Sequence, residues 1–147
     1  MDELDLRVRR HVYRRFVELG RAPRVEEVAT ELELPLADAE ASLLRLHDAH
    51  ALVLLPDSLE LMMANPFAAI ETPHRVQAGG RSWFAVCAWD SFGIPAALGV
   101  NGHVSSRCAC CDEPVEIDVV GHAPVPDAYP VHLLVPARHW WDDIAYT

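Results

Sequence analysis

Cys87 and Asp90 are two side chains whose spacing could do chemistry on one small ligand. They lie three residues apart in the segment Trp83–Pro95, and on a helix this spacing puts both on one face. The dipole and the free N–H groups at a helix start favour the thiolate form of a cysteine placed there. Burial raises the pKa of an aspartate, so Asp90 could hold or relay a proton. The pair could therefore hold a soft metal beside a proton donor.

The surroundings of this pair decide between that chemistry and a structural role. Four flanking aromatic residues predict an apolar environment: Trp83, Phe84, Trp89 and Phe92. Taken alone, the spacing favours a buried structural cysteine with Asp90 as a helix cap or a surface charge, because free cysteines are commonly buried.

Three further cysteines, Cys108, Cys110 and Cys111, form a second group of thiols. In a cytosolic protein such thiols are more often reactive or metal-binding than disulfide-bonded. A Cys-x-x-Cys segment is half of a structural zinc site, which needs a second pair of ligands. Four histidines could complete it, although none has diagnostic spacing: His103, His122, His132 and His139.

The elements that must position these groups begin with a helical module at residues 1–66. Apolar residues at helical spacing predict helices over 4–19, 25–32 and 35–46. Two apolar segments around a Pro-Asp-Ser turn predict a hairpin over 52–63. Three helices followed by a hairpin are typical of a winged-helix-like module.

The pattern changes in the second predicted unit, residues 67–147. A strand from Trp83 to Val86 leads into a helix that carries Cys87 and Asp90, and further strands are predicted over 103–106, 115–119 and 131–135. The tail from residue 139 to 147 has helical character. The predicted fold class is therefore α+β, a winged-helix-like three-helix module followed by a small mixed or antiparallel sheet domain with a cysteine-bearing helix.

The charge pattern disfavours a nucleic-acid partner. The net charge is −10, and all 12 basic residues are arginines. The third helix carries Asp38, Glu40 and Asp48 against Arg45 alone, which is the wrong sign for a helix that enters the major groove. The first helix is rich in arginine, but a solvated helix face explains that equally well.

Composition predicts a packed cytoplasmic protein without a membrane partner. About half of the residues are apolar, 51%, which favours a globular core over disorder. No apolar run approaches the roughly 20 residues that span a bilayer, and the acidic start lacks the apolar segment of a secretory signal.

The longer string of residues resembles the organomercurial (alkylmercury) lyase family. The likeness is sharpest over residues 81–119, where an aromatic run precedes Cys87 and Asp90 and an apolar Pro-Ala stretch follows them. The strand Val104–Cys108 and the Pro114-Val115 turn also match. This resemblance implies that Cys87 takes up the organomercurial as a thiolate, that Asp90 assists proton delivery to the departing carbon, and that no organic cofactor is needed. It also implies mercury(II) as the product ligand and small-molecule or protein thiols as acceptors.

The resemblance also implies a second catalytic cysteine downstream, and residues 139–147 resemble the approach to it. The sequence ends at Thr147 without a cysteine there. We expect a truncated piece of a longer protein, or alternatively a natural short relative with altered activity. Cys108 matches a cysteine regarded as structural in the family, whereas Cys110 and Cys111 go beyond the pattern and could supply a replacement thiol or an auxiliary soft-metal site.

Two other functions stay open on the sequence. One is a non-enzymatic protein that binds soft metals or thiols through Cys87 and the Cys108–Cys111 segment. The other is a winged-helix regulator in which those thiols sense metal, which the acidic charge disfavours.

Overall fold

The computed structural model describes residues 1–127, 129–133 and 135–144. Helices α1 (Glu3–Leu19), α2 (Val25–Glu31) and α3 (Leu36–Asp48) come first, and helix α4 (Ala88–Leu98) lies between strands β5 and β6. The eight strands are β1 (Val53–Leu54), β2 (Leu61–Ala64), β3 (Phe67–Ala68), β4 (Arg75–Ala78), β5 (Arg81–Ala85), β6 (Gly102–Arg107), β7 (Pro114–Val120) and β8 (Ala123–Val125). The 3₁₀ helix η1 (Ala137–Asp142) follows.

Helix α1 is defined by its two ends and by one buried carboxylate. The Asp2 side chain accepts a hydrogen bond from the Asp5 N–H (2.9 Å), and Gly20 ends the helix with a left-handed backbone (φ 70°). The buried Asp5 carboxylate accepts hydrogen bonds from Ser42 Oγ (2.7 Å) and Arg45 Nη2 (2.8 Å) of α3. These bonds fix α1 against α3, and they pair Arg45, the arginine of the third helix, with a buried carboxylate.

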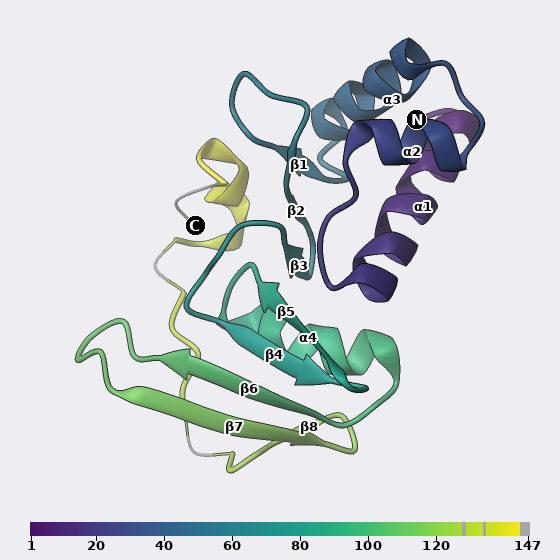
Figure 1. Cartoon of the computed structure of the whole chain (residues 1–147). Helices are drawn as coiled ribbons and strands as arrows, with labels where there is room; N and C mark the ends of the chain where they lie inside the picture. The colour runs from purple at the N-terminus through teal and green to yellow at the C-terminus, as the bar shows by residue number, and fades with distance from the viewer. Residues whose placement is uncertain (128, 134, 145–147) are drawn as a thin grey trace.

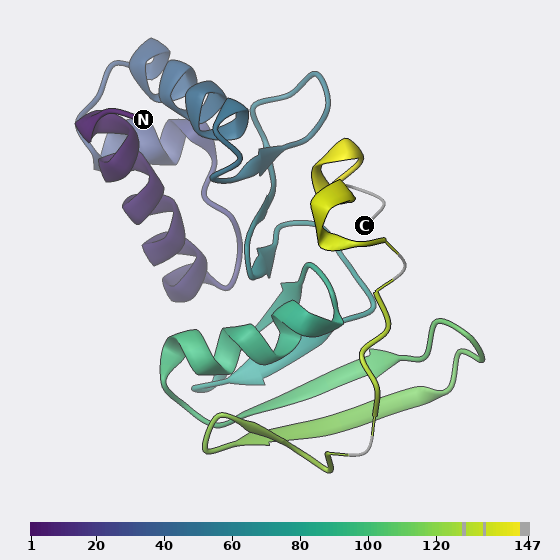
Figure 2. The same ribbon diagram turned by 180° about the vertical axis from the view of Figure 1, so that it is seen from behind.

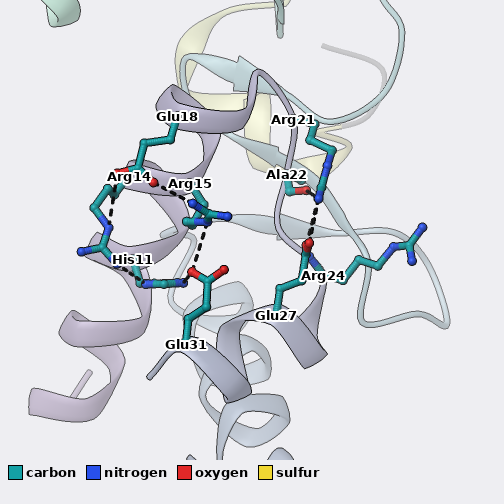
Figure 3. A network of polar contacts seen from close by, with 9 residues as sticks. All are labelled: His11, Arg14, Arg15, Glu18, Arg21, Ala22, Arg24, Glu27 and Glu31. Carbon is teal, nitrogen blue, oxygen red and sulfur yellow. Dashed lines mark hydrogen bonds and ion pairs between the residues drawn. The ribbon is translucent and has the colours of Figure 1, made fainter. Parts of the chain in front are cut away.

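Two arginines of α1 are likewise paired within the helical module (Figure 3). Arg14 lies 2.9 Å from His11 Nδ1, and Arg15 contacts Glu18 (2.8 Å) and Glu31 (3.1 Å). His11 is buried and lies 3.2 Å from the same Glu31 carboxylate. Part of the positive charge of α1 is therefore engaged in contacts within the helical module.

One antiparallel sheet joins the helical module to the rest of the chain. Its strand order is β1-β2-β3-β5-β4-β6-β7-β8, and every paired neighbour is antiparallel. The predicted boundary between residues 66 and 67 lies between β2 and β3, which pair with each other, and it remains a prediction. Figure 1 shows the three helices above the longer strands, with η1 beside the β1–β2 hairpin.

Helix α4 covers one face of β4, β5 and β6 (Figure 2). Its fully buried Ile94 packs in the same core as Val76 and Val104 of the sheet. Gly102 allows the close approach, because a Cβ there would lie 2.6 Å from Pro95 Cγ in the helix. The packing of α4 on the sheet therefore fixes the position of the helix N-terminus, where Cys87 lies.

The elements predicted before residue 120 are present, although strands β3 and β4 were not predicted, and the prediction fails near the C-terminal end. The three helices, the hairpin, the strand before Cys87 and the strands over 103–106 and 115–119 are all present. The predicted strand over 131–135 is wrong: residues 131–133 and 135 form no strand, and residue 134 lies outside the described residues. Residues 137–142 form a 3₁₀ helix, residues 145–147 lie outside the description, and strand β8 was not predicted. No helix in the described ranges is long and apolar enough to cross a bilayer.

Candidate active site

Cys87 lies at the junction between strand β5 and helix α4, where it is the N-cap residue. Its backbone is extended (φ −146°, ψ 178°), and its carbonyl accepts the first helical hydrogen bond, from Ser91 N–H at 3.0 Å. The Ser91 hydroxyl donates to the Ala88 carbonyl (2.6 Å) and closes the same turn. The sequence at this junction therefore places a thiol at the open end of a helix.

The structure brings Cys87 and Asp90 together, as their spacing predicts. The Cys87 thiol donates to Asp90 Oδ2 at 3.3 Å, and both side chains are partly buried. Burial raises the pKa of Asp90, although the hydrogen bond from Cys87 opposes this. A carboxyl group with a raised pKa beside a thiol can accept its proton and later release it.

The resting state of Cys87 differs from the sequence prediction of a favoured thiolate. Burial raises the pKa of the thiol, the negative charge and side chain of Asp90 raise it further, and N–H groups of Asp90 and Trp89 oppose the change. The prediction considered the helix start alone, and it missed the larger cost of a buried thiolate beside a carboxylate. The surroundings of Cys87 therefore favour the protonated thiol over the thiolate.

The backbone around the pair is fixed by residues that the sequence analysis missed. The Ala85 N–H donates to the His74 carbonyl (2.8 Å), and Thr72 Oγ1 donates to the Ala85 carbonyl (2.7 Å). On the next strand, Ser106 Oγ lies 2.8 Å from His74 Nδ1. Burial lowers the pKa of His74, which favours its neutral form. No spacing in the sequence indicates these bonds, because they depend on the pairing of β4 with β5 and β6.

The four aromatic residues predicted to surround the pair differ in their burial. Trp89 is 65% exposed, and Trp83 is buried in the core, where its indole N–H bonds the Phe16 carbonyl. Phe84 and Phe92 are half-buried. Val86, which precedes Cys87, packs on a cluster of distant apolar residues: Val53, Leu55, Met62, Met63 and Ile144. The prediction is therefore wrong for Trp89.

The other three cysteines lie together in the turn that joins β6 to β7. All are free thiols; Cys108 is half-buried, whereas Cys110 and Cys111 are exposed. N–H groups of Cys110 and Cys111, together with the Cys111 thiol, lower the pKa of Cys108. An N–H of Glu113 lowers the pKa of Cys111, but its interaction with the Cys108 sulfur and partial desolvation raise it overall. Cys108 is thus the more acidic thiol of an interacting pair.

The histidines considered for a zinc site lie elsewhere or have other partners. His103 lies 2.6 Å from Asp118 and 2.8 Å from Glu116 on β7, and His139 lies 2.8 Å from Asp142. Across residues 1–127, 129–133 and 135–144, no group of three or more His, Cys, Asp or Glu side chains is placed to hold a metal ion. Zinc binding stays untested as a prediction.

Two known proteins have sequences similar to this chain. The chain is similar to the alkylmercury lyase of Pseudomonas putida, with 36% identity over 53 residues that cover 36% of this chain and 25% of that protein. It also matches the alkylmercury lyase of Staphylococcus epidermidis, with 26% identity over 95 residues, or 65% of this chain and 42% of the relative. The chain thus spans less than half the length of these two relatives.

A solved structure and a family model extend these matches. The crystal structure of the mercury-bound form of MerB2 has the same fold, with a TM-score of 0.68, 22% identity, and coverage of 86% of this chain and 62% of that one. The model of the alkylmercury lyase family matches residues 67–147, a range that contains Cys87, Asp90 and the β6–β7 turn. Since that range is more than half of the sequence, this chain belongs to the alkylmercury lyase family.

Proposed function

We propose that this protein cleaves carbon–mercury bonds by thiolate capture and protonolysis, with Cys87 as the mercury ligand and Asp90 as the proton carrier. The 3.3 Å contact between the Cys87 sulfur and Asp90 Oδ2, inside the segment that matches the family, carries the proposal. A soft thiolate suits mercury, and a carboxyl group with a raised pKa suits proton transfer.

The first step of the proposed reaction needs only the side chains of Cys87 and Asp90. An organomercurial R–Hg–X meets the Cys87 thiol, a sulfur–mercury bond forms, X leaves as an anion, and the thiol proton moves to the Asp90 carboxylate. This transfer is short because the thiol already donates to that carboxylate. It also removes the charge repulsion that raises the pKa of Cys87.

The second step breaks the carbon–mercury bond. The Asp90 proton adds to the carbon, R–H leaves, and mercury(II) stays on the Cys87 sulfur. A further thiolate must then bind mercury to balance its charge, and a thiol from solution or from another protein can supply it. No electron is gained or lost by the protein, so the reaction needs no organic cofactor.

The surroundings support this role for the protein. Val86, the residue before Cys87, packs on an apolar cluster, and apolar surroundings suit an alkyl or aryl group on mercury. The winged-helix-like module then serves to hold the sheet rather than to read DNA, because Arg15 pairs with Glu18 and Glu31, and Arg45 pairs with Asp5. We place the reaction in the cytoplasm, where thiol acceptors are abundant.

The proposal is tested by incubating the protein with phenylmercury acetate and an excess of monothiol, and by measuring benzene in the headspace. Benzene released above the protein-free rate is expected. Mercury bound without benzene would instead indicate a non-enzymatic soft-metal protein.

A further inference from the structure

The β6–β7 turn carries a pair of thiols that the proposed reaction does not use. Cys108 and Cys111 have the Cys-x-x-Cys spacing within one turn, and each of the two thiols shifts the pKa of the other; the Cys111 thiol also donates to a Glu113 carboxylate oxygen at 3.6 Å. Cys110 lies between them in sequence and is exposed, and its thiol is not among the groups that shift the pKa of Cys108 or Cys111. The turn projects from the end of the sheet, where a ligand can reach it from solution (Figure 1).

The backbone of this turn is held in one conformation. The Cys108 N–H donates to the Glu113 carbonyl (2.9 Å), and the Asp112 N–H donates to the Cys108 carbonyl (2.8 Å). Arg107 donates hydrogen bonds to the Asp112 carboxylate through Nε (2.6 Å) and Nη2 (2.8 Å), and its Nη2 also donates to the Asp112 carbonyl. The backbone that carries both thiols is therefore held in place before any ligand arrives, which lowers the entropic cost of chelation.

The chemistry of two adjacent thiolates selects a particular class of ion. Zinc in structural sites takes four protein ligands, whereas mercury(II) forms stable complexes with two thiolates. Soft sulfur ligands favour soft metals over hard ones.

The turn also lies at the same end of the sheet as Cys87. Ala85, two residues before Cys87, pairs with His74, whose ring lies 2.8 Å from Ser106 Oγ, two residues before Cys108. Two strand spacings separate residues 85 and 106, or about 10 Å. A mercury ion leaving Cys87 would thus find a dithiol on the same edge of the sheet.

We propose that Cys108 and Cys111 form a dithiol site that chelates a soft, thiophilic metal ion, with mercury(II) as its ligand. Two S–H bonds break, two mercury–sulfur bonds form, and two protons pass to the thiolates that delivered the ion or to water. No group is oxidised or reduced. Binding at this site stands independently of the lyase reaction, whereas its use as an acceptor of the product rests on the proposed function.

The test uses the full chain with Cys87→Ser, which leaves the three thiols of the turn and removes the proposed reaction centre. The protein is loaded with mercuric chloride, dialysed against excess glutathione, and assayed for retained mercury. Two thiols in one turn hold mercury roughly 10²–10⁴-fold more tightly than separate monothiols, so about one mercury per chain is expected to remain. Adding Cys108→Ser or Cys111→Ser should reduce the retained mercury by at least about tenfold.

Cys110→Ser in the same background is the matched control, and it should retain the metal. The loaded Cys87→Ser protein is also alkylated and mapped by mass spectrometry, a measurement that needs no change in the turn. Cys108 and Cys111 should be protected and Cys110 modified. Loss of metal in the Cys110→Ser variant, retention in either of the other two, or equal alkylation of all three thiols would overturn the proposal. Because benzene release is not measured here, failure of the dithiol site and failure of the lyase reaction are separate results.

Discussion

The indole Nε1 of Trp83 donates a 2.7 Å hydrogen bond to the backbone carbonyl of Phe16, at the end of helix α1. Phe67 lies between the two residues, with its ring 5.5 Å from Phe16 and 6.0 Å from Trp83. This contact ties the helical module to the strand that leads into Cys87. The two parts share one hydrophobic core, which runs from Val8 to Val119.

Replacing Trp83 with phenylalanine should therefore destabilise the whole chain. The variant loses a buried hydrogen bond and part of a buried ring, and we expect a loss of about 1–3 kcal/mol in the free energy of unfolding by urea. Trp89→Phe is the matched control, because Trp89 is 65% exposed, and its effect should stay within about 0.5 kcal/mol. Equal stabilities of the two variants would argue against the shared core.

A pair of glycine substitutions tests how α4 is seated on the sheet. Gly102→Ala should cost about 1–3 kcal/mol, because its Cβ would lie 2.6 Å from Pro95 Cγ and 3.1 Å from the Gln77 carbonyl. Gly93→Ala within α4 meets Pro66 Cβ at an ordinary 3.5 Å and should stabilise the helix by up to about 1 kcal/mol. Thermal unfolding of the two variants should move in opposite directions, and a shift of both in the same direction would contradict this packing.

The buried Asp5 carboxylate should make the fold sensitive to acid. A hydrogen bond from Arg45 lowers the pKa of Asp5 from 3.8 to about 2, against the opposing effect of burial. The folded protein binds this proton more weakly than the unfolded chain does. The stabilisation is therefore present above about pH 4 and is lost as the pH falls toward 2, by about 2 kcal/mol.

Asp5→Asn should reduce the fall in the free energy of unfolding between pH 4 and pH 2, as measured by urea unfolding. The exposed Asp38 on α3 provides a control, and Asp38→Asn should leave the profile unchanged. If the free energy of unfolding of Asp5→Asn fell with pH as steeply as that of the wild type, groups other than Asp5 would be responsible for the loss of stability in acid.

Asp90→Asn should separate mercury binding from bond cleavage. The amide cannot take the thiol proton, so benzene release should fall by roughly 10²–10⁴-fold while mercury(II) still binds Cys87. The charge of Asp90 also contributes to the raised pKa of Cys87, so this pKa should fall in the variant. The rate of Cys87 alkylation against pH measures that change, and an unchanged profile would show that Asp90 does not act on the thiol.

The sequence was sufficient to predict the parts of the site that depend on local spacing. Cys87 and Asp90 are three residues apart across the first turn of a helix, so their contact follows from helix geometry alone. The strand before them and the strands on either side of the thiol-rich turn were also predicted, and β7 shows the apolar alternation of a strand at Val115, Ile117 and Val119.

Features that depend on tertiary packing could not be predicted in this way. Trp83 and Trp89 are both aromatic residues near Cys87, yet only the first lies against the helical module, and no local pattern distinguishes them. The pKa of Cys87 depends on burial as well as on the helix start, and burial is a property of the whole fold. The bond between His74 and Ser106 needs the antiparallel pairing of β4 and β6, whose residues are about thirty positions apart.

The most direct test of the proposed reaction compares benzene release by the wild type, Cys87→Ser and Cys110→Ser under single-turnover conditions. Phenylmercury is mixed with an excess of each protein and of a monothiol in heavy water, and the gas is analysed by mass spectrometry. We predict singly deuterated benzene from the wild type and from Cys110→Ser, and only the protein-free rate from Cys87→Ser. Equal release from Cys87→Ser and the wild type, or no release from any of the three, would contradict the assignment of Cys87 as the mercury-binding nucleophile.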